Sequence, residues 1–119
     1  MAWEVEFTHE FGTWWYELDE TSQNAVFAAV ERLIEHGPTL GRPTVDTIRA
    51  SRHPNMKELR PAASSIRILF VFDPRRTAIL LIGGDKRGQW NAWYAEMIPI
   101  ADRLYDEHLE TLRSEGELP

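Results

Sequence analysis

Two arginines occupy positions that could bring them together on one face of a β-sheet. Arg60 lies in the segment 57–61, and Arg67 lies in the apolar segment 66–72. If residues 63 and 64 form a two-residue turn, the two guanidinium groups lie directly opposite each other, whereas a one-residue change in the turn separates them. Opposed like charges destabilise a strand pair. The arrangement is therefore easier to explain if an anion binds between the two arginines.

A third cation, Lys86, is predicted on the same face as Arg67. If residues 73–76 form the next turn, residue 67 pairs with residue 82, and even-numbered positions of the last strand share the Arg67 face. Lys86 has that parity. Three cations gathered at one end of a sheet can bind a phosphodiester and stabilise the additional charge of its transition state.

Cleavage of RNA would need few further groups. An RNA strand carries its own nucleophile, the 2′-hydroxyl group, so the protein supplies a base, an acid and charge stabilisation. His53, in the loop before the Arg60 strand, is the candidate for proton transfer because histidine changes its charge near neutral pH. A solvated loop histidine without a catalytic role is the alternative, and Lys57 or Lys86 could act if strongly desolvated. No metal or cofactor is expected.

The charge of the chain is unevenly distributed. The formal net charge of −6 over 119 residues argues against a simple nucleic-acid binder. Between residues 49 and 87, however, nine basic and three acidic residues give a net charge of +6, so the remainder carries −12. This segment is expected to form a face that attracts phosphate, although solvent-facing strand edges would give the same pattern. Its other residues expected to bind RNA are Lys57, Arg52, Arg75, Arg76 and Arg87.

The composition limits the class of protein. With 43% hydrophobic residues the chain can build one packed domain, expected to span residues 1–119. It has no cysteine, so disulfides and thiolate metal sites are excluded. No basic start precedes an apolar stretch, so neither a signal peptide nor a membrane span is expected, and a cytoplasmic location is predicted. The sequence contains no HExxH, GxGxxG or GxSxG motif.

The amino-terminal third predicts one strand and two helices. Apolar and acidic residues alternate over 3–7, as is typical of a half-buried strand. An aromatic-rich helix is expected over 10–18, and Asp19 is the predicted N-cap of the next helix. Apolar residues at helical spacing then continue to the stop signal Gly37-Pro38. The two helices are expected to form an antiparallel pair lying on a sheet.

The rest of the chain predicts the sheet and a long helix. Gly83-Gly84 is expected to end or kink the last strand. The pattern becomes helical after Gln89, with a kink or break expected just before Pro99. This order predicts an α+β domain with an antiparallel sheet. The other expected elements are a loop at 39–55 with a short strand near Ile48, and strands at 57–61, 66–72 and 77–82.

Four consecutive motifs carry a family resemblance. They are MKELRP at 56–61, RILFVFDPRR at 67–76, LLIGGDKRGQW at 80–90 and WYAEMIPIADRLYDEHL at 93–109. With these motifs the sequence resembles the HigB-type toxins of the RelE/ParE superfamily, in the branch that also contains phage-derived proteins. The resemblance is strong over residues 56–109 and looser before them. It implies a RelE-like fold, in which an N-terminal helix pair and a C-terminal helix flank a small antiparallel sheet.

The resemblance also implies a function. Family members are toxins of type II toxin–antitoxin systems, and many cut messenger RNA, usually in the ribosomal A site. A cognate antitoxin, often with a helix-turn-helix domain, neutralises the toxin, and the pair contacts operator DNA through the antitoxin. Carried over to this sequence, the arginine of KELR is Arg60, the arginine of RILF is Arg67 and the lysine of GGDK is Lys86. The strand register selects the same three residues.

A non-enzymatic protein of the same fold is the alternative hypothesis. It would bind DNA gyrase, as ParE-like relatives do, or act only as a co-repressor with its antitoxin. The net negative charge favours this alternative, and the pattern of three cations favours RNA cleavage. Phe70 stands where family members often carry tyrosine, which removes one hydroxyl group.

Overall fold

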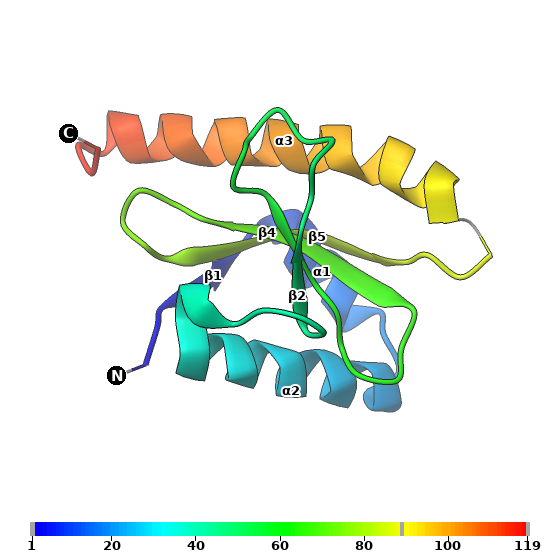
Figure 1. Ribbon diagram of the computed structural model, residues 1–119. Coiled ribbons are helices and arrows are strands. Elements are labelled where there is room, and N and C mark those ends of the chain that lie inside the picture. The colour runs from blue at the N-terminus through cyan, green and yellow to red at the C-terminus, as the bar shows by residue number, and fades with distance from the viewer. Residues whose placement is uncertain (1, 89, 119) are drawn as a thin grey trace.

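Nine elements build a sheet with helices on both faces (Figure 1). The computed structural model describes residues 2–88 and 90–118. The α+β class predicted from the sequence is confirmed. In chain order the elements within the described residues are β1 (Val5–Phe7), α1 (His9–Tyr16), α2 (Glu20–His36), the short 3₁₀ helix η1 (Gly37–Thr39), β2 (Val45–Thr47), β3 (Lys57–Leu59), β4 (Ile66–Phe72), β5 (Ala78–Asp85) and α3 (Trp90–Ser114).

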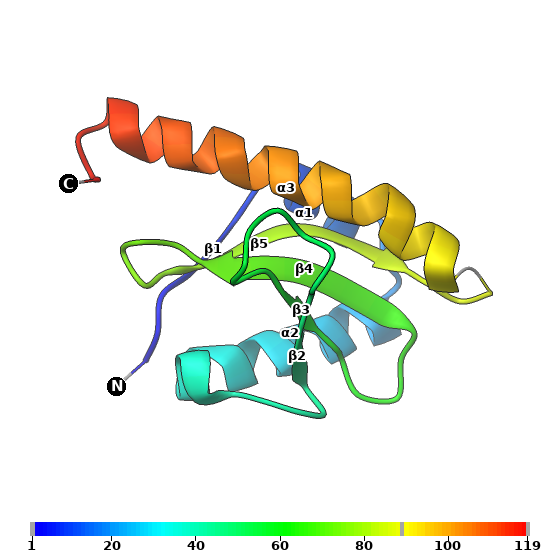
Figure 2. The ribbon, with the colours of Figure 1, turned by 45° about the horizontal axis from the view of Figure 1, so that its top comes forward.

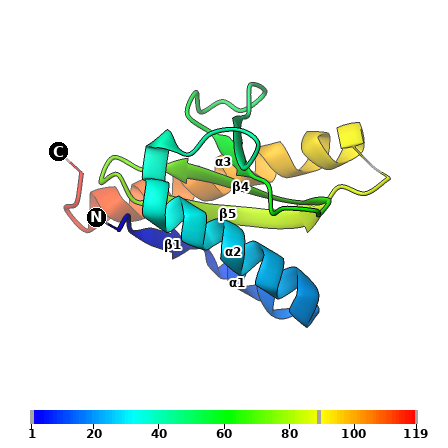
Figure 3. The same ribbon diagram turned by 60° about the horizontal axis from the view of Figure 1, so that its bottom comes forward.

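The sheet is covered on both sides. Helices α1 and α2 lie on one face and α3 crosses the other (Figures 2 and 3). On the first face, Phe11 of α1 and Leu33 of α2 share a buried cluster with Phe70 and Leu80. Alternate strand residues point to opposite faces, so the intervening residues of β4 and β5 pack beneath α3. That second cluster contains Leu69, Val71, Ile79, Leu81, Trp93, Ala101 and Leu104.

The sheet is mixed, so the prediction of a purely antiparallel sheet is wrong. The strand order is β1-β5-β4-β3-β2. β1 runs parallel to β5, with Val5 opposite Ala78 and Phe7 opposite Leu80, whereas the other three pairings are antiparallel. The connection after β1 contains both α1 and α2. It leads to β2 at the other edge of the sheet, and the chain then returns through three antiparallel pairings, so β5 runs beside β1 in the parallel direction.

The β3–β4 hairpin has the predicted register. Glu58 lies opposite Leu69 and Leu59 lies opposite Ile68. Continued one step, this register places position 60 opposite Arg67, as the two-residue turn requires. Because Leu69 packs beneath α3, positions 58, 60 and 67 belong to the face that α3 covers. The adjoining strand β2 ends at Thr47, one residue before Ile48, near which a short strand was expected.

The β4–β5 hairpin differs from its predicted register by two residues. Arg67 lies opposite Gly84, not opposite residue 82. One residue of this shift arises at the turn, where the N–H of Asp73 bonds the carbonyl of Thr77 and leaves a loop of residues 74–76. Arg76 closes the loop with a φ of 66°, the left-handed conformation found in three-residue hairpin loops.

A bulge contributes the second residue of the shift. The pairing between β4 and β5 changes register between Leu69 and Phe70. A bulge adds an unpaired residue to one strand and turns the following side chains to the other face. Two successive one-residue shifts restore the original parity. Lys86 therefore belongs to the same face of the sheet as Arg67, as the sequence predicted from a different register.

Two glycines allow indole rings to lie against β5. The strand runs through Gly83 and Gly84 to Asp85, so the pair does not end it, which was one of the two expected effects. A Cβ atom on Gly83 would lie 2.4 Å from the ring of Trp14, and one on Gly84 would lie 2.5 Å from Nε1 of Trp93. The two rings come from opposite faces, because Trp14 belongs to α1 and Trp93 to α3. The glycines are required for packing of both layers.

Substitution of Gly83 by alanine is expected to lower the free energy of unfolding by about 1–3 kcal/mol. The added methyl group overlaps the rigid Trp14 ring, and either the ring or the strand must move. Urea unfolding monitored by tryptophan fluorescence measures the change. Gly41→Ala is the matched control, since its Cβ would meet nothing within 4 Å. Equal stability of the two variants would contradict the proposed packing role.

The helix ends follow the predicted signals in two of three places. The Asp19 side chain accepts a hydrogen bond of 2.7 Å from the N–H of Ser22, which confirms it as the N-cap of α2. Helix α2 ends at His36 directly before Gly37. Of the kink or break expected before Pro99, the break is wrong, because α3 is continuous from Trp90 to Ser114.

Helix α3 tolerates its proline because tertiary packing holds it. Pro99 cannot donate the usual bond to the carbonyl of residue 95. The neighbouring Ile98 and Ala101 are nevertheless buried beneath the helix, and apolar residues continue to Leu112. Packing of an apolar face supplies most helix stability in proteins. Although α3 is the longest helix, none in residues 2–88 and 90–118 is long and apolar enough to cross a membrane.

Candidate active site

The predicted arginines meet around a buried carboxylate, Glu58. Nη2 of Arg60 donates a 2.8 Å hydrogen bond to Oε2 of Glu58, and Nε of Arg67 lies 3.8 Å from Oε1. Only 4% of the Glu58 side chain is exposed. The register described above dictates this meeting, since all three residues share the α3 face of neighbouring strands. Glu58 was counted in the sequence only as one of three acids within a basic segment.

Lys86 joins the same cluster from the end of β5. It is buried, and its Nζ lies 3.2 Å from the centroid of the Trp90 ring and 5.6 Å from that of Tyr94. Burial lowers the pKa of Lys86, and the charge of Arg67 lowers it further. The three cations predicted to converge are therefore close enough to influence one another.

Tyr94 is a site residue that the sequence reasoning missed. Its hydroxyl donates a 2.6 Å hydrogen bond to Oε1 of Glu58. Burial and this bond raise the pKa of Tyr94 to about 12, so the hydroxyl keeps its proton at neutral pH. Tyr94 lies in the first turns of α3, within the motif WYAEM, and only the packing of α3 on β3 and β4 brings it to the carboxylate.

Two buried donors in the cluster have no partner. Arg67 donates from Nη1 to the carbonyls of Ser64 and Ile66, at 3.0 and 2.8 Å, which fixes its guanidinium group near the β3–β4 turn. The Nε atoms of Arg60 and Arg67 are the buried side-chain polar atoms without a hydrogen-bond partner in the described residues. An unpaired buried donor costs free energy, so two at one site indicate that a ligand acceptor belongs there.

Carboxylates only partly neutralise the cluster. Asp46 lies 3.3 Å from Nη2 of Arg60 and also accepts from Arg42 at 2.9 Å. Hydrogen bonding to Arg42 and to the N–H of Thr47 keeps the pKa of Asp46 below its usual value, so it stays charged. With Arg42 and Lys86 included, four cations face the carboxylates Asp46 and Glu58 and a third carboxylate, Asp85, which Arg67 influences. The remaining positive charge suits a phosphate group.

His53 does not join the three cations. Its Nε2 lies 2.9 Å from Oδ1 of Asp106, and its ring stacks edge-on against Tyr105 at 4.7 Å. Asp106 follows Tyr94 by twelve residues, about 18 Å along a helix at 1.5 Å per residue. The loop before β3 lies against α3 and places His53 beside Asp106 and Tyr105.

Arg75 and Arg76 lie at the opposite end of the sheet. They form the β4–β5 turn, six or more residues along β4 from Arg67, which corresponds to about 20 Å of strand. Arg75 is paired with Asp73 and Glu6, each at 2.9 Å, and Arg76 stacks over Trp3 at 5.3 Å. Both arginines have structural partners at a distance from the cluster.

The remaining predicted RNA contacts are divided among three places. Arg52 bonds Asp106 on the carboxyl-terminal half of α3. Lys57 lies opposite Phe70, whose side chain belongs to the α1–α2 face, so Lys57 points away from the cluster. Arg87 is exposed and follows Lys86 directly. Of the five residues, Arg87 therefore lies beside the cluster, and Arg52 lines the same surface hollow as Tyr94.

Asp73 is a buried carboxylate with a structural role. Burial alone would raise its pKa, but hydrogen bonds from His108 and Arg75 outweigh that effect and hold it below the usual 3.8. A carboxyl whose folded pKa is lowered stabilises the fold fully above its unfolded pKa and loses that contribution as pH falls through the folded pKa.

The stability difference between wild type and Asp73→Asn is therefore expected to depend on pH. It should be largest at neutral pH and shrink as pH falls below 3.8, because protonated Asp73 no longer gains from His108 and Arg75. Urea unfolding at a series of pH values measures the difference. Glu96→Gln, an exposed change on α3, serves as control. A wild-type advantage that stays constant to the lowest pH would show that the charge of Asp73 is unimportant.

No group of three or more metal-ligating side chains was found among the residues that the structure describes. The cluster itself contains groups that could act on a phosphodiester. Three cations can hold a phosphate, a carboxylate can accept a proton, and a tyrosine and a buried lysine can donate one. This set of groups is what phosphodiester cleavage through an internal hydroxyl requires.

A family model described as "Phage derived protein Gp49-like (DUF891)" matches residues 13–106. The chain belongs to the Gp49-like family. The matched range contains Glu58, Arg60, Arg67, Lys86 and Tyr94 and spans most of the chain. The family predicted from the four sequence motifs is confirmed.

Relatives with similar sequences carry toxin names. The chain is 50% identical over 103 residues to a protein named as the toxin HigB3 of Mycobacterium tuberculosis (strain ATCC 25618 / H37Rv), covering 87% of this chain and 90% of HigB3. It is 49% identical over 112 residues to the protein named as toxin HigB2 of the same strain. That match covers 92% of this chain but only 55% of HigB2, so the Gp49-like chain spans about half of that relative.

Solved structures of RelE toxins share the fold. The isolated Escherichia coli RelE toxin matches with a TM-score of 0.61 and 14% identity, over 82% of this chain and 99% of RelE. The toxin–antitoxin complex RelBE2 of Mycobacterium tuberculosis contains a chain that matches with a TM-score of 0.56 and 17% identity, over 71% of this chain and 99% of that one. At such identities the likeness establishes the RelE-like fold alone.

Proposed function

We propose that this Gp49-like chain is the toxin of a type II toxin–antitoxin system and inhibits translation by cleaving messenger RNA on the ribosome. The observation that carries the proposal is the cluster in which Arg60, Arg67 and Lys86 surround Glu58 and Tyr94, with two buried guanidinium N–H groups unpaired. The toxin names of its relatives support the same conclusion.

In the proposed reaction the three cations hold the scissile phosphate. Its oxygens accept from the free Nε donors of Arg60 and Arg67 and gain negative charge when the 2′-hydroxyl attacks phosphorus. Glu58 accepts the proton of that hydroxyl. Lys86, with its lowered pKa, donates to the departing 5′-oxygen. Tyr94 keeps the Glu58 carboxylate oriented, and His53 takes no part.

The proposed partners follow from this assignment. Trp90 is exposed beside Lys86 and can stack on a base next to the cleaved bond. The ribosome would present messenger RNA to the cluster of Arg60, Arg67 and Lys86. A protein that acts on ribosomes in this way would work in the cytoplasm. A cognate antitoxin with a helix-turn-helix domain would neutralise the toxin and contact operator DNA for the pair.

Induced expression in a bacterial host tests the proposal. Growth should stop, and mapping of transcript 5′ ends should reveal new ends within translated reading frames that disappear when translation initiation is blocked. Intact transcripts with defective plasmid supercoiling would support the gyrase-binding alternative, which the net charge of −6 favours. Growth arrest with neither effect would contradict both hypotheses.

A further inference from the structure

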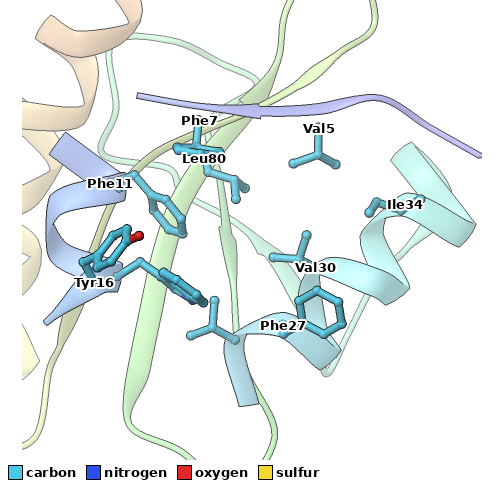
Figure 4. A pocket seen from close by; sticks show the side chains of 11 residues that line it. Val5, Phe7, Phe11, Tyr16, Phe27, Val30, Ile34 and Leu80 are labelled. Atoms are coloured by element: carbon cyan, nitrogen blue, oxygen red, sulfur yellow. The ribbon is translucent and has the colours of Figure 1, made fainter. Parts of the chain in front are cut away.

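An apolar groove lies on the face of the sheet opposite the candidate active site. It has a volume of about 340 Å³ and is bounded by β1, α1 and α2 (Figure 4). Val5 and Phe7 of β1 form one wall, and Phe27 and Val30 of α2 form the facing wall (Figure 4). The groove contributes nothing to the phosphate cluster beneath α3.

The groove gathers most of the large apolar side chains that the fold leaves exposed. In the described part of the chain four such side chains are exposed, and three of them line the groove: Phe7 at 63%, Tyr16 at 82% and Phe27 at 60%. Isolated exposed apolar residues are ordinary, but a contiguous group indicates an interaction surface.

The rim of the groove offers unpaired backbone groups. β1 is an edge strand, and within the described residues it pairs only with β5. The carbonyl of Glu4 accepts from Ala78, and the N–H of Thr8 donates to Leu80, so the even-numbered positions face β5. In a parallel pairing the intervening residues direct their N–H and C=O groups away from the partner strand. Those of Val5 and Phe7 therefore face outward above the groove.

The chain segment that builds most of the groove is strongly acidic, although one of its carboxylates, Glu6, is paired with Arg75. Residues 2–36, which include β1, α1 and α2, contain eight acidic residues and one basic residue, Arg32. This part of the chain accordingly carries a net charge of −7. A binding partner that buries the apolar walls brings its own flanking residues against this charge, so lysine and arginine are the complementary choice.

We propose that this groove binds an extended segment of a partner protein in which apolar residues alternate with lysine or arginine. The segment adds to the free edge of β1 as a sixth strand and pairs with the outward backbone groups of Val5 and Phe7. Its apolar side chains enter the groove with those of Val5 and Phe7, and its basic side chains point to the opposite face of the sheet, on the side of Glu4 and Glu6. Strand addition of this kind takes affinity from the backbone and specificity from alternate side chains.

Two other occupants fit less well. A second copy of the chain, docked by the same face, would place one acidic surface against another and incur like-charge repulsion. An α-helix would fill the groove but leave the edge of β1 unpaired. Because the groove and the cluster lie on opposite faces, the inference holds whether or not the chain cleaves RNA.

Selection from a phage-displayed library of random dodecapeptides on the immobilised chain tests the proposal. Enriched peptides should alternate apolar and basic residues and bind more weakly as salt rises. Phe27→Ser should weaken their binding about tenfold or more, as loss of a central aromatic contact does. Ala28→Ser, an exposed change one residue along the same helix, is the matched control and should bind as wild type does.

A backbone modification separates strand addition from other modes. N-methylation removes a backbone N–H donor. Methylation of the peptide residues whose N–H groups face β1 should abolish binding, whereas methylation of the intervening residues should leave binding intact. Equal effects of methylation at the two sets of residues would overturn the proposal. Selection of acidic peptides, of peptides with apolar residues at helical spacing, or of no peptide at all would also overturn it. So would equal binding of the peptides to wild type and Phe27→Ser. Concentration-dependent dimerisation that Phe27→Ser abolishes would assign the groove to a second copy of the chain and overturn the proposal as well. Transcript cleavage by the Phe27→Ser variant should match wild type, so failure of this inference is distinguishable from failure of the ribonuclease assignment.

Discussion

Replacement of Arg67 by alanine is expected to abolish growth arrest while the protein remains folded. The guanidinium group carries a free buried Nε donor and lies 3.8 Å from Glu58, where the proposed phosphate binds. Loss of one group that stabilises transition-state charge lowers the rate by about 10²–10³-fold. The fold should survive because, within the described residues, Arg67 donates hydrogen bonds only to the carbonyls of Ser64 and Ile66, at the end of the sheet.

Transcript-end mapping and growth curves after induction measure the effect, and circular dichroism checks the fold. Arg76→Ala is the matched control, since it removes an equal charge from the turn at the opposite end of the sheet. It should retain both cleavage and growth arrest. Full toxicity of a folded Arg67→Ala protein, or equal loss in both variants, would argue against the phosphate site.

Substitution of Glu58 by glutamine is expected to separate RNA binding from RNA cleavage. Cleavage should fall by about 10²-fold or more, since the proposed base is lost. Affinity for an RNA phosphate should rise, because one carboxylate no longer competes for Arg60 and Arg67. The amide keeps the shape of Glu58 and can still accept from Tyr94.

Single-turnover cleavage on programmed ribosomes and titration with a short non-cleavable oligonucleotide measure the two quantities. Glu96→Gln, at an exposed site on α3, is the control and should change neither. If Glu58→Gln weakens binding and cleavage together, Glu58 holds the arginines in place and does not act as the base. If cleavage is unchanged, the proton acceptor lies elsewhere.

Strand parity explains why the cationic cluster was predictable. The placement of Arg60 opposite Arg67 depends on the register of the β3–β4 hairpin, and the structure has the predicted register. Lys86 was placed correctly although the β4–β5 register differs by two residues, because side-chain direction repeats every two residues. The apolar pattern likewise predicted β4 and the N-cap Asp19, which depend on local sequence alone.

Features that depend on contacts between distant segments were not predictable. Tyr94 meets Glu58 across 36 residues of sequence, and only the path of α3 over the sheet determines that contact. His53 was assigned to the cluster from its position before β3, but the loop follows α3 to Asp106 instead. The parallel pairing of β1 with β5 depends in the same way on the path of the chain, which passes to the far edge of the sheet after β1 and returns through three antiparallel pairings.

The most direct measurement is cleavage of a ribosome-bound messenger RNA carrying a single 2′-deoxy nucleotide at the mapped cleavage position. Attack by the 2′-hydroxyl within the Arg60, Arg67 and Lys86 cluster predicts that this transcript stays intact, while the all-ribose transcript yields an upstream fragment ending in a 2′,3′-cyclic phosphate. Undiminished cleavage of the 2′-deoxy transcript would contradict the proposed role of the cluster.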